Sequence, residues 1–145
     1  MTKPGEFSPD VVELIWIRDG GACVDCGMPQ VRERRGEAFG GWSIQHREAR
    51  GAGGTSKGAV RKNARPWLVL ASNGAVMCGT GVTGCHGRAE TKDRRRAFDL
   101  GFAVRPGVRR PAEMPIRHAL HGWVTLTDDG DWEPAEAPEE EAIAA

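Results

Sequence analysis

The stretch from Val76 to Glu90, VMCGTGVTGCHGRAE, places two cysteines, a histidine and four glycines within fifteen residues. Cys78 and Cys85 lie seven positions apart, and the glycines between them allow the loop to curl tightly around a metal ion. His86 follows the second cysteine directly. The stretch therefore offers ligands for a structural metal and, beside them, an imidazole that is left for other chemistry.

A second cysteine pair lies upstream. Cys23 and Cys26 have the C-x2-C spacing of a zinc knuckle, and Gly27 permits the tight turn after them. In a reducing compartment, an even set of cysteines with this spacing is more typical of a metal site than of disulfides. Two alternatives stay open, namely free buried cysteines and a redox pair formed by Cys23 and Cys26. We predict a closed, structural zinc site formed by four thiolates: Cys23, Cys26, Cys78 and Cys85.

Length and charge restrict the class of protein. A chain of 145 residues is long enough for one compact domain and too short for two full ones. The formal net charge is zero, but the segment from Asp128 onward holds eight acidic residues and no basic ones. The rest of the chain therefore has 20 basic residues against 12 acidic ones, a difference of +8. This excess predicts a surface that binds a polyanion.

The hydropathy pattern contains no membrane or export signal. No apolar run has the length of a membrane span, and the N-terminal stretch MTKPGEFSPD lacks the apolar region of a signal peptide. We therefore expect a soluble, cytoplasmic protein without a membrane partner.

A helix is predicted near the N-terminus, between Ser8-Pro9-Asp10 and Gly20-Gly21. Ser8 would be the N-cap, proline would occupy the first helical position, and the two glycines would end the helix. Its mostly apolar face comprises Val11, Leu14, Ile15 and Ile17.

The rest of the chain alternates between short elements and glycine-rich loops. Residues 42–46 alternate apolar and polar side chains as a half-buried strand does. Residues 47–62 predict a long exposed loop, and residues 66–70 fit either a short helix or a buried strand. Residues 86–100 predict one helix closed by Gly101. Short strands are expected at 76–78, 103–105 and 123–126, and a disordered tail from Glu133.

An ordered set of residues runs through the middle of the chain: Trp42-Ser43-Ile44-Gln45-His46-Arg47, Ala49-Arg50-Gly51-Ala52-Gly53-Gly54-Thr55, Asn73, Cys78-Gly79-Thr80-Gly81 and Thr83-Gly84-Cys85-His86-Gly87. This set resembles the HNH nucleases, in particular the small phage-encoded members that carry a four-cysteine zinc site. The resemblance covers residues 23–115. It implies an α+β fold with a ββα-metal core, also called the His-Me finger, beside an N-terminal helix and short C-terminal strands.

The chain is divided accordingly into four parts. Residues 1–22 would form a helix that packs on the core, and residues 23–115 the HNH nuclease domain. Residues 116–132 would be an extension with a short strand, and residues 133–145 a disordered acidic tail.

The resemblance implies a role for each motif residue. His46 would be the general base that deprotonates the attacking water, since a histidine with a pKa near 6.5 is largely neutral at physiological pH. Asn73 would order the loop between the two strands by side-chain to backbone hydrogen bonds, although a plain turn asparagine is an alternative. His86 would bind the catalytic metal. Glu90, one helical turn later, would be a second ligand or an exposed carboxylate paired with a basic neighbour.

Gln45 departs from the family pattern. Many members have Asp or His directly before the base, and that residue binds the catalytic metal, whereas glutamine offers only a neutral carbonyl oxygen. Mg²⁺ or Mn²⁺, which keep several waters, tolerate such a ligand better than a zinc-type catalytic site would. Either Gln45 is a weak ligand in a magnesium or manganese site with few protein ligands, or the chain has lost activity and kept the fold.

Basic residues lie near His46 and near His86 in the sequence. They are predicted to bind phosphates on either side of the cleaved bond with little base specificity. His118 and His121 lie outside the motif and are expected to be surface or packing residues. The predicted DNA contacts are Arg47, Arg50, Lys57, Arg61, Lys62, Arg88, Arg94 and Arg95.

The leading hypothesis is a metal-dependent DNA endonuclease that hydrolyses phosphodiester bonds, by nicking or by double-strand cleavage. The resemblance implies that it is phage-encoded, acts in the host cytoplasm and has a terminase or another packaging protein as a partner. The alternative is a catalytically weak or inactive zinc-stabilised module that binds DNA or a packaging protein. DNA cleavage that depends on His46 distinguishes the two.

Overall fold

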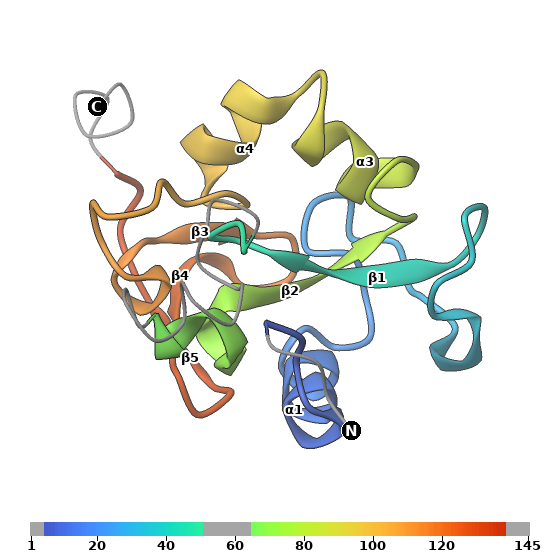
Figure 1. Ribbon diagram of the computed structural model, residues 1–145, viewed down its shortest axis with the longest axis horizontal. Coiled ribbons are helices and arrows are strands. Elements are labelled where there is room, and N and C mark those ends of the chain that lie inside the picture. Colours follow the sequence, from blue (N-terminus) through green and yellow to red (C-terminus); the bar gives the residue numbers. More distant parts are fainter. Residues whose placement is uncertain (1–4, 51–64, 139–145) are drawn as a thin grey trace.

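A computed structural model gives the fold of the chain (Figure 1), and it describes residues 5–50 and 65–138. The fold is mixed α+β, with short helices packed around two small antiparallel sheets. The α+β class predicted from the sequence is confirmed at this level. None of the described helices is long and apolar enough to cross a lipid bilayer.

Helix α1 (Pro9–Arg18) begins and ends where the sequence predicts. The Ser8 hydroxyl accepts a hydrogen bond from the Val11 amide at 3.3 Å, which satisfies one of the free N–H groups of the first turn. Asp19 closes the helix, and the chain then turns at Gly20 and Gly21, both with positive φ.

The predicted apolar face of α1 is wrong in part. Ile15 is fully buried, but Leu14 is 41% exposed and Ile17 is 66% exposed. Helix α1 packs mainly on β2 and the turn before it, with Trp16 also against Trp42 of β1, so its buried stripe is narrow. Val11, Val12 and Trp16 are half-buried at the edges of that stripe.

The central sheet consists of β1 (Trp42–His46) and β2 (Gly74–Cys78), which run antiparallel. Trp42 lies opposite Cys78, and His46 lies opposite Gly74. Helix α1 packs on one side of this pair of strands, and the helices that follow β2 lie on the other (Figure 1). The core on the α1 side comprises Phe7, Ile15, Trp42, Ile44, Ala71 and Val76.

Two helices replace the single helix predicted over residues 86–100. They are α3 (Gly84–Glu90) and α4 (Arg94–Leu100), separated by a turn at Thr91–Asp93. The Thr91 hydroxyl donates to the Gly87 carbonyl at 2.7 Å, so a side chain takes up a carbonyl at the end of α3. Gly101 closes α4 with a φ of 81°, as predicted.

Short 3₁₀ helices form the remaining regular segments between residues 23 and 115. The structure resolves the ambiguity at residues 66–70 in favour of a helix, η2 (Pro66–Val69), which is followed directly by η3 (Ala71–Asn73). The other two such helices among the described residues are η1 (Arg32–Arg34) and η4 (Pro111–Glu113). The predicted strand at 103–105 is only an isolated bridge between Val104 and Glu48.

The C-terminal extension is a three-stranded antiparallel sheet rather than one short strand. Its strands are β3 (Ile116–His118), β4 (Gly122–Leu126) and β5 (Trp132–Pro134), in the order β3-β4-β5. Strand β5 continues past Glu133, so the predicted start of the disordered tail is wrong at this boundary. Residues 139–145 of that tail, and most of the predicted loop at 47–62, lie outside the described residues.

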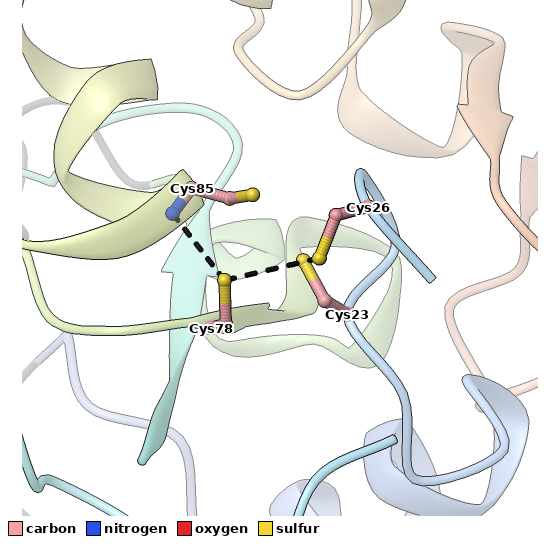
Figure 2. A group of neighbouring side chains, drawn as sticks. All are labelled: Cys23, Cys26, Cys78 and Cys85. Carbon is pink, nitrogen blue, oxygen red and sulfur yellow. Dashed lines mark hydrogen bonds between the residues drawn. The ribbon is translucent and has the colours of Figure 1, made fainter. Parts of the chain in front are cut away.

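The turn after α1 carries Cys23 and Cys26 to the end of β2 and the start of α3, where Cys78 and Cys85 lie (Figure 2). Segments from three parts of the sequence therefore meet at one point.

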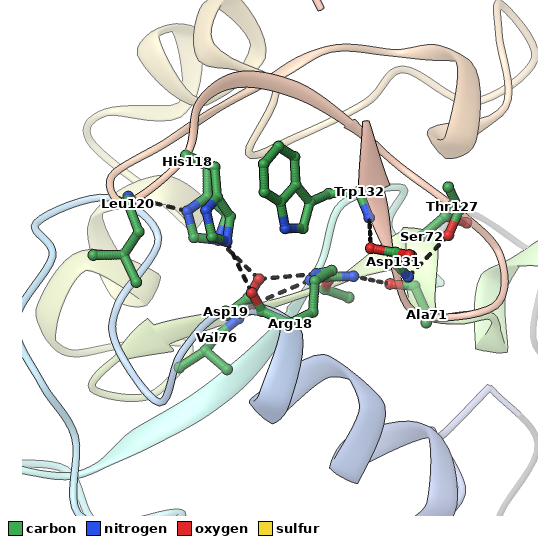
Figure 3. A network of polar contacts seen from close by, with 12 residues as sticks. Arg18, Asp19, Ala71, Ser72, Val76, His118, Leu120, Thr127, Asp131 and Trp132 are labelled. Atoms are coloured by element: carbon green, nitrogen blue, oxygen red, sulfur yellow. Dashed lines mark hydrogen bonds and ion pairs between the residues drawn. The ribbon is translucent and has the colours of Figure 1, made fainter. Parts of the chain in front are cut away.

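A buried ionic network joins α1 to both sheets (Figure 3). The Arg18 guanidinium donates to both oxygens of Asp19, at 2.9 and 3.0 Å, and both side chains are fully buried. Asp19 also accepts from the Val76 amide in β2 at 2.9 Å and pairs with His118 Nε2 in β3 at 2.9 Å. His118 is thus a packing residue, as expected.

This network also controls the ionisation of Asp19. Burial by itself would raise the pKa of Asp19, but Arg18 and His118 outweigh it and hold the pKa below its usual value. The stability that the carboxylate contributes is therefore present above a pH of about 4. It is lost as the pH falls through the lowered pKa of the folded state.

We predict that Asp19→Ala lowers the free energy of unfolding by about 3–5 kcal/mol, because Arg18 and His118 lose a buried partner. Asp10→Ala is the matched control, since it removes an exposed carboxylate from the first turn of α1. It should cost less than about 1 kcal/mol. Urea unfolding followed by tryptophan fluorescence measures both variants, and equal losses would contradict the role of Asp19.

Candidate functional site

The four cysteines form one cluster (Figure 2), and each is free of disulfide bonds. Their sulfur atoms all lie within 4.8 Å of one another, and Cys26 Sγ and Cys78 Sγ are 3.9 Å apart. A tetrahedral ion with metal–sulfur bonds of about 2.3 Å holds its sulfurs roughly 3.8 Å apart. The cluster therefore has the composition and the dimensions to hold a metal ion such as zinc.

Glycines shape both loops that carry these cysteines, as the sequence predicts. After the first pair, Gly27 has a φ of 77°, and its amide donates to the Cys23 carbonyl at 2.9 Å. In the second loop a Cβ on Gly79 would lie 2.2 Å from the Thr83 carbonyl oxygen. Only glycine permits that close approach, which brings Cys78 and Cys85 together.

The cluster favours a cation on electrostatic grounds. The Cys85 thiol donates to Cys23 and lowers the pKa of Cys23 to about 5, while the same interaction raises the pKa of Cys85. Burial raises the pKa of Cys26 to about 11. One thiolate thus forms readily and further thiolates do not, unless a divalent cation offsets their mutual repulsion.

His86 lies outside the sulfur cluster although it follows Cys85 directly. Its Nδ1 is 2.5 Å from the hydroxyl of Ser43, and that hydroxyl donates its own proton to the Gly79 carbonyl at 2.7 Å. Because Ser43 has one hydroxyl proton, it must accept from His86, and Nδ1 therefore carries the imidazole proton. The lone pair is then on Nε2. Burial lowers the pKa of His86 to about 4, so the ring is neutral at physiological pH.

Glu90 lies beside the lone pair of His86. Its Oε1 is 3.9 Å from His86 Nε2, one turn along α3, and its side chain is 36% exposed. The other carboxylate oxygen is 3.8 Å from Arg94 Nη1. Two neighbouring ligands on a small octahedral cation with bonds of about 2.0–2.2 Å lie roughly 3 Å apart, so the half-exposed Glu90 side chain reaches a cation on His86 Nε2 after a turn toward it. Glu90 is therefore placed for both roles considered from the sequence, metal ligand and partner of an arginine.

His46, at the end of β1, is held by a different segment. Its Nε2 is 2.8 Å from the Gly5 carbonyl oxygen, and its ring stacks on Phe7 with the centroids 4.4 Å apart. A carbonyl can only accept, so Nε2 carries the proton and the lone pair of the neutral ring is on Nδ1. His46 therefore has the opposite tautomer to His86.

The pKa of His46 reports what surrounds the ring. Burial is the main cause of its lowering, and Arg50 and His86 lower it further. The Gly5 carbonyl and Glu90 act in the opposite direction. The His46 ring is thus close enough to His86 and Glu90 of α3 for their charges to shift its pKa.

The two imidazoles lie on opposite faces of the sheet at the end of β1, close enough for His86 to lower the pKa of His46. Side chains alternate along a strand, so Ser43 and Gln45 point to the α3 side, and His46 points to the α1 side, where Phe7 lies. No hydrogen bond joins His46 to His86 among the described residues. Within residues 5–50 and 65–138, the lone pairs on His46 Nδ1 and on His86 Nε2 accept no hydrogen bond.

Asn73 ties together the loops around His46. Its Oδ1 accepts from the Glu48 amide at 2.7 Å, and its Nδ2 donates to the Glu48 and Leu68 carbonyls at 3.2 and 3.0 Å. The side chain is fully buried. These are bonds of the kind that the resemblance implies, because they fix the chain two residues after His46 to the segment before β2.

Gln45 points into the core, with no exposed surface. Its Nε2 donates to the Phe102 carbonyl at 3.2 Å, whereas its Oε1 has no hydrogen-bond partner among the described residues. An orphaned buried oxygen on the His86 side of β1 is compatible with a ligand role. The burial of Gln45 equally explains why this position lacks a charged ligand, since a carboxylate there would need a buried counter-charge.

Arg47 is not a DNA contact, which corrects the sequence prediction. Its guanidinium is fully buried and donates to four backbone carbonyls, those of Ser72, Gly101, Pro111 and Met114, at 2.7–3.0 Å. Burial lowers its pKa to about 9, which leaves it charged at physiological pH. Arg47 therefore fastens the end of β1 to the segment after α4 and to η4.

The other residues predicted to contact DNA lie in different environments. Arg88 Nη2 donates to Cys85 Sγ at 3.1 Å, and Arg94 lies over the Phe98 ring. Arg95 is exposed on α4, and Arg50 is exposed at the edge of the described segment. Lys57, Arg61 and Lys62 lie outside the described residues.

Three contributors to the site escaped the sequence reasoning. Ser43 was foreseeable, because strand alternation puts it on the same face as Gln45, where α3 packs. Gly5 and Phe7 carry no motif that points to His46 from 39 residues or more upstream.

Comparison with known proteins found no matching family model, no matching curated protein and no matching solved structure.

We predict a defined tautomer for each of His46, His86 and His118 at pH 8. His86 should carry its proton on Nδ1, and His46 should carry it on Nε2 because of the carbonyl of Gly5. His118 should also carry it on Nε2, since its Nδ1 accepts from the Leu120 amide at 3.1 Å. Long-range ¹H–¹⁵N spectra distinguish protonated from bare ring nitrogens, with assignment by single His→Gln variants. A protonated Nε2 on His86 would contradict the proposed lone pair toward Glu90.

Proposed function

We propose that the protein is a metal-dependent HNH-type endonuclease that hydrolyses phosphodiester bonds in DNA. The observation that carries the proposal is the pair of neutral imidazoles with opposite tautomers. One has its lone pair on Nε2 beside Glu90, and the other has its lone pair on Nδ1 at the end of β1. One nitrogen suits a metal ligand and the other a general base.

The proposed zinc has a structural role. Four cysteine ligands would complete its coordination, so it has no open position for water and cannot take part in hydrolysis. It would instead fix the start of α3 to the end of β2 and to the turn after α1. The proposed ββα-metal core is then the unit β1, β2 and α3.

His46 would act as the general base. Its Nδ1 takes a proton from water as the water oxygen forms a bond to phosphorus, and the bond from phosphorus to the leaving sugar oxygen breaks. That oxygen is then protonated, and the imidazolium of His46 returns its proton to solvent. The Gly5 carbonyl, which accepts from Nε2–H, stabilises the imidazolium.

His86 Nε2 and Glu90 would hold the catalytic cation, with the Gln45 oxygen as a third candidate ligand. A bound Mg²⁺ or Mn²⁺ would supply charge stabilisation to the phosphorane and to the leaving oxygen. The Ser43 hydroxyl orients His86 for this role, as a partner on the far nitrogen of a metal-binding histidine generally does.

DNA binding would rest on the arginines that accompany α3 and α4. Arg94 and Arg95 begin α4, and Arg88 lies on α3 near Glu90. Contacts of this kind go to phosphates, so we expect salt-sensitive binding with little base specificity. A phage origin and a terminase or packaging partner are carried by the resemblance alone and stay part of the proposal.

One observation favours the alternative of an inactive, zinc-stabilised DNA-binding or packaging module. Gln45 is buried and its amide is bonded to the Phe102 carbonyl, so the position that supplies a charged metal ligand in many HNH nucleases is occupied by a core residue. A cation held by His86 and Glu90 alone would bind weakly.

We predict that the purified protein carries one zinc ion per chain and that Cys78→Ser loses both the ion and the cooperative thermal transition. The reason is that zinc-bound folding is lost when a thiolate is removed. Val82→Ala, an exposed change in the same loop, should keep the ion. Atomic absorption and thiol titration of the native protein measure this. Reactive Cys23 and Cys26 without bound metal would instead support the redox alternative.

We predict that the protein nicks or linearises supercoiled plasmid DNA in Mg²⁺ or Mn²⁺, and that His46→Ala lowers the rate by about 10²–10⁴-fold. His86→Ala should also lose cleavage but keep its zinc, because His86 lies outside the sulfur cluster. His121→Gln is the control, since His121 stacks on Trp132 in the C-terminal sheet and should leave cleavage unchanged. Binding without cleavage under every divalent ion would overturn the nuclease proposal and support the inactive module.

A further inference from the structure

The segment from Gly5 to Phe7 lies over the His46 ring. Phe7 stacks on the imidazole with an interplanar angle of 22° and a centroid distance of 4.4 Å. The Gly5 carbonyl accepts from His46 Nε2 at 2.8 Å. The segment thus touches one face of the ring and the nitrogen that does not act as the base.

This segment is anchored outside the strand–strand–helix unit. Phe7 is only 8% exposed and packs with Ile15 of α1 in the core below the sheet. Gly74, which lies opposite His46, makes room for it, since a Cβ on Gly74 would lie 3.0 Å from Phe7 Cζ. Ser8, the next residue, is the N-cap of α1. The Phe7 ring therefore has little freedom to move away from His46.

We propose that Gly5 and Phe7 are positioning residues for His46: the stacked ring fixes the plane of the imidazole, and the carbonyl fixes its tautomer. The inference rests on the proposed function, in which His46 Nδ1 is the base. It assigns to the N-terminal segment a task in the reaction, in addition to its packing role.

The two contacts are complementary. A flat aromatic neighbour restricts rotation of the imidazole about its bond to Cβ, and a carbonyl selects the one tautomer that leaves Nδ1 bare. Without them, the ring would spend part of its time with Nδ1 protonated or turned away from the phosphate. Because the segment contacts His46 alone among the proposed motif residues in the described contacts, its loss should lower kcat and leave KM unchanged.

Two variants remove the contacts separately, in the full chain with its metal. Phe7→Leu keeps apolar volume in the core but removes the flat face. Gly5→Ala forces a side chain onto a residue with a φ of 84°, which displaces the carbonyl. Val12→Ala is the matched control, because Val12 packs in the same core and does not contact His46 in the described structure.

The first measurement is the tautomer of His46 at pH 8 by long-range ¹H–¹⁵N spectra, without Mg²⁺ or DNA. In Gly5→Ala the two ring nitrogens should shift toward an average of the two tautomers, because the carbonyl that selects the tautomer is displaced. Phe7→Leu should shift them less, because a ring that is free to rotate keeps the hydrogen bond to the Gly5 carbonyl only part of the time. Val12→Ala should keep the wild-type shifts. Unchanged shifts in both test variants would overturn the proposal. Because the spectra need no cleavage, this result stands even if the wild-type protein proves inactive and the nuclease proposal fails.

The second measurement is the kinetics of plasmid cleavage. Loss of one positioning contact should lower kcat roughly three- to tenfold at unchanged KM, the range expected for a single hydrogen bond or aromatic contact. Should an active wild-type enzyme and the two test variants share the same kcat despite altered tautomers, the segment has no role in the reaction and the proposal is wrong.

Discussion

The sulfur cluster is the junction on which the arrangement of the candidate site depends. Its four cysteines come from the turn after α1, the end of β2 and the start of α3, which are distant in sequence. Helix α3 has only seven residues and would be marginal alone. The cluster fixes its first turn against the sheet, and His86, next in the chain, then meets the Ser43 hydroxyl. The cysteine cluster thus determines the direction in which His86 Nε2 points.

Buried polar side chains do much of the remaining work of fastening the elements together. Arg18 and Asp19 link α1 to β2 and β3, and Arg47 links β1 to the segment after α4. Asn73 links the segment after β1 to the segment before β2. In a small domain with short elements, such bonds fix the chain around His46 more specifically than apolar contacts would. They also explain why Arg47, directly after His46, is not available to DNA.

The features that were predictable are those that depend on local sequence. Ser8 as a cap, the alternating strand at Trp42–His46, the glycines beside the cysteines and the αL glycine after α4 each follow from conformational preferences of a few residues. The cysteine cluster was predictable because spacing and even number limit what four thiols can do.

The predictions that were wrong, and the site residues that were not predicted, depend on tertiary contacts. The sequence predicts a surface cation at Arg47, because the residues next to it in the sequence give no indication of the four carbonyls that surround its guanidinium. The break between α3 and α4 occurs at Thr91–Asp93, where Thr91 and Asp93 are weak helix formers and the Thr91 hydroxyl bonds to the Gly87 carbonyl, and both short helices pack on one core. Phe7 and Gly5 reach His46 only because α1 folds back beneath the sheet, a contact that local patterns cannot indicate.

The central claim, that one metal is structural and a second site is open beside His86, is tested most directly by anomalous diffraction from crystals soaked in Mn²⁺. We expect zinc between the four sulfur atoms and a separate manganese peak at His86 Nε2 and Glu90. A single metal that is bound by the cysteines together with His86, or no manganese at His86 in crystals that retain their zinc, would contradict it.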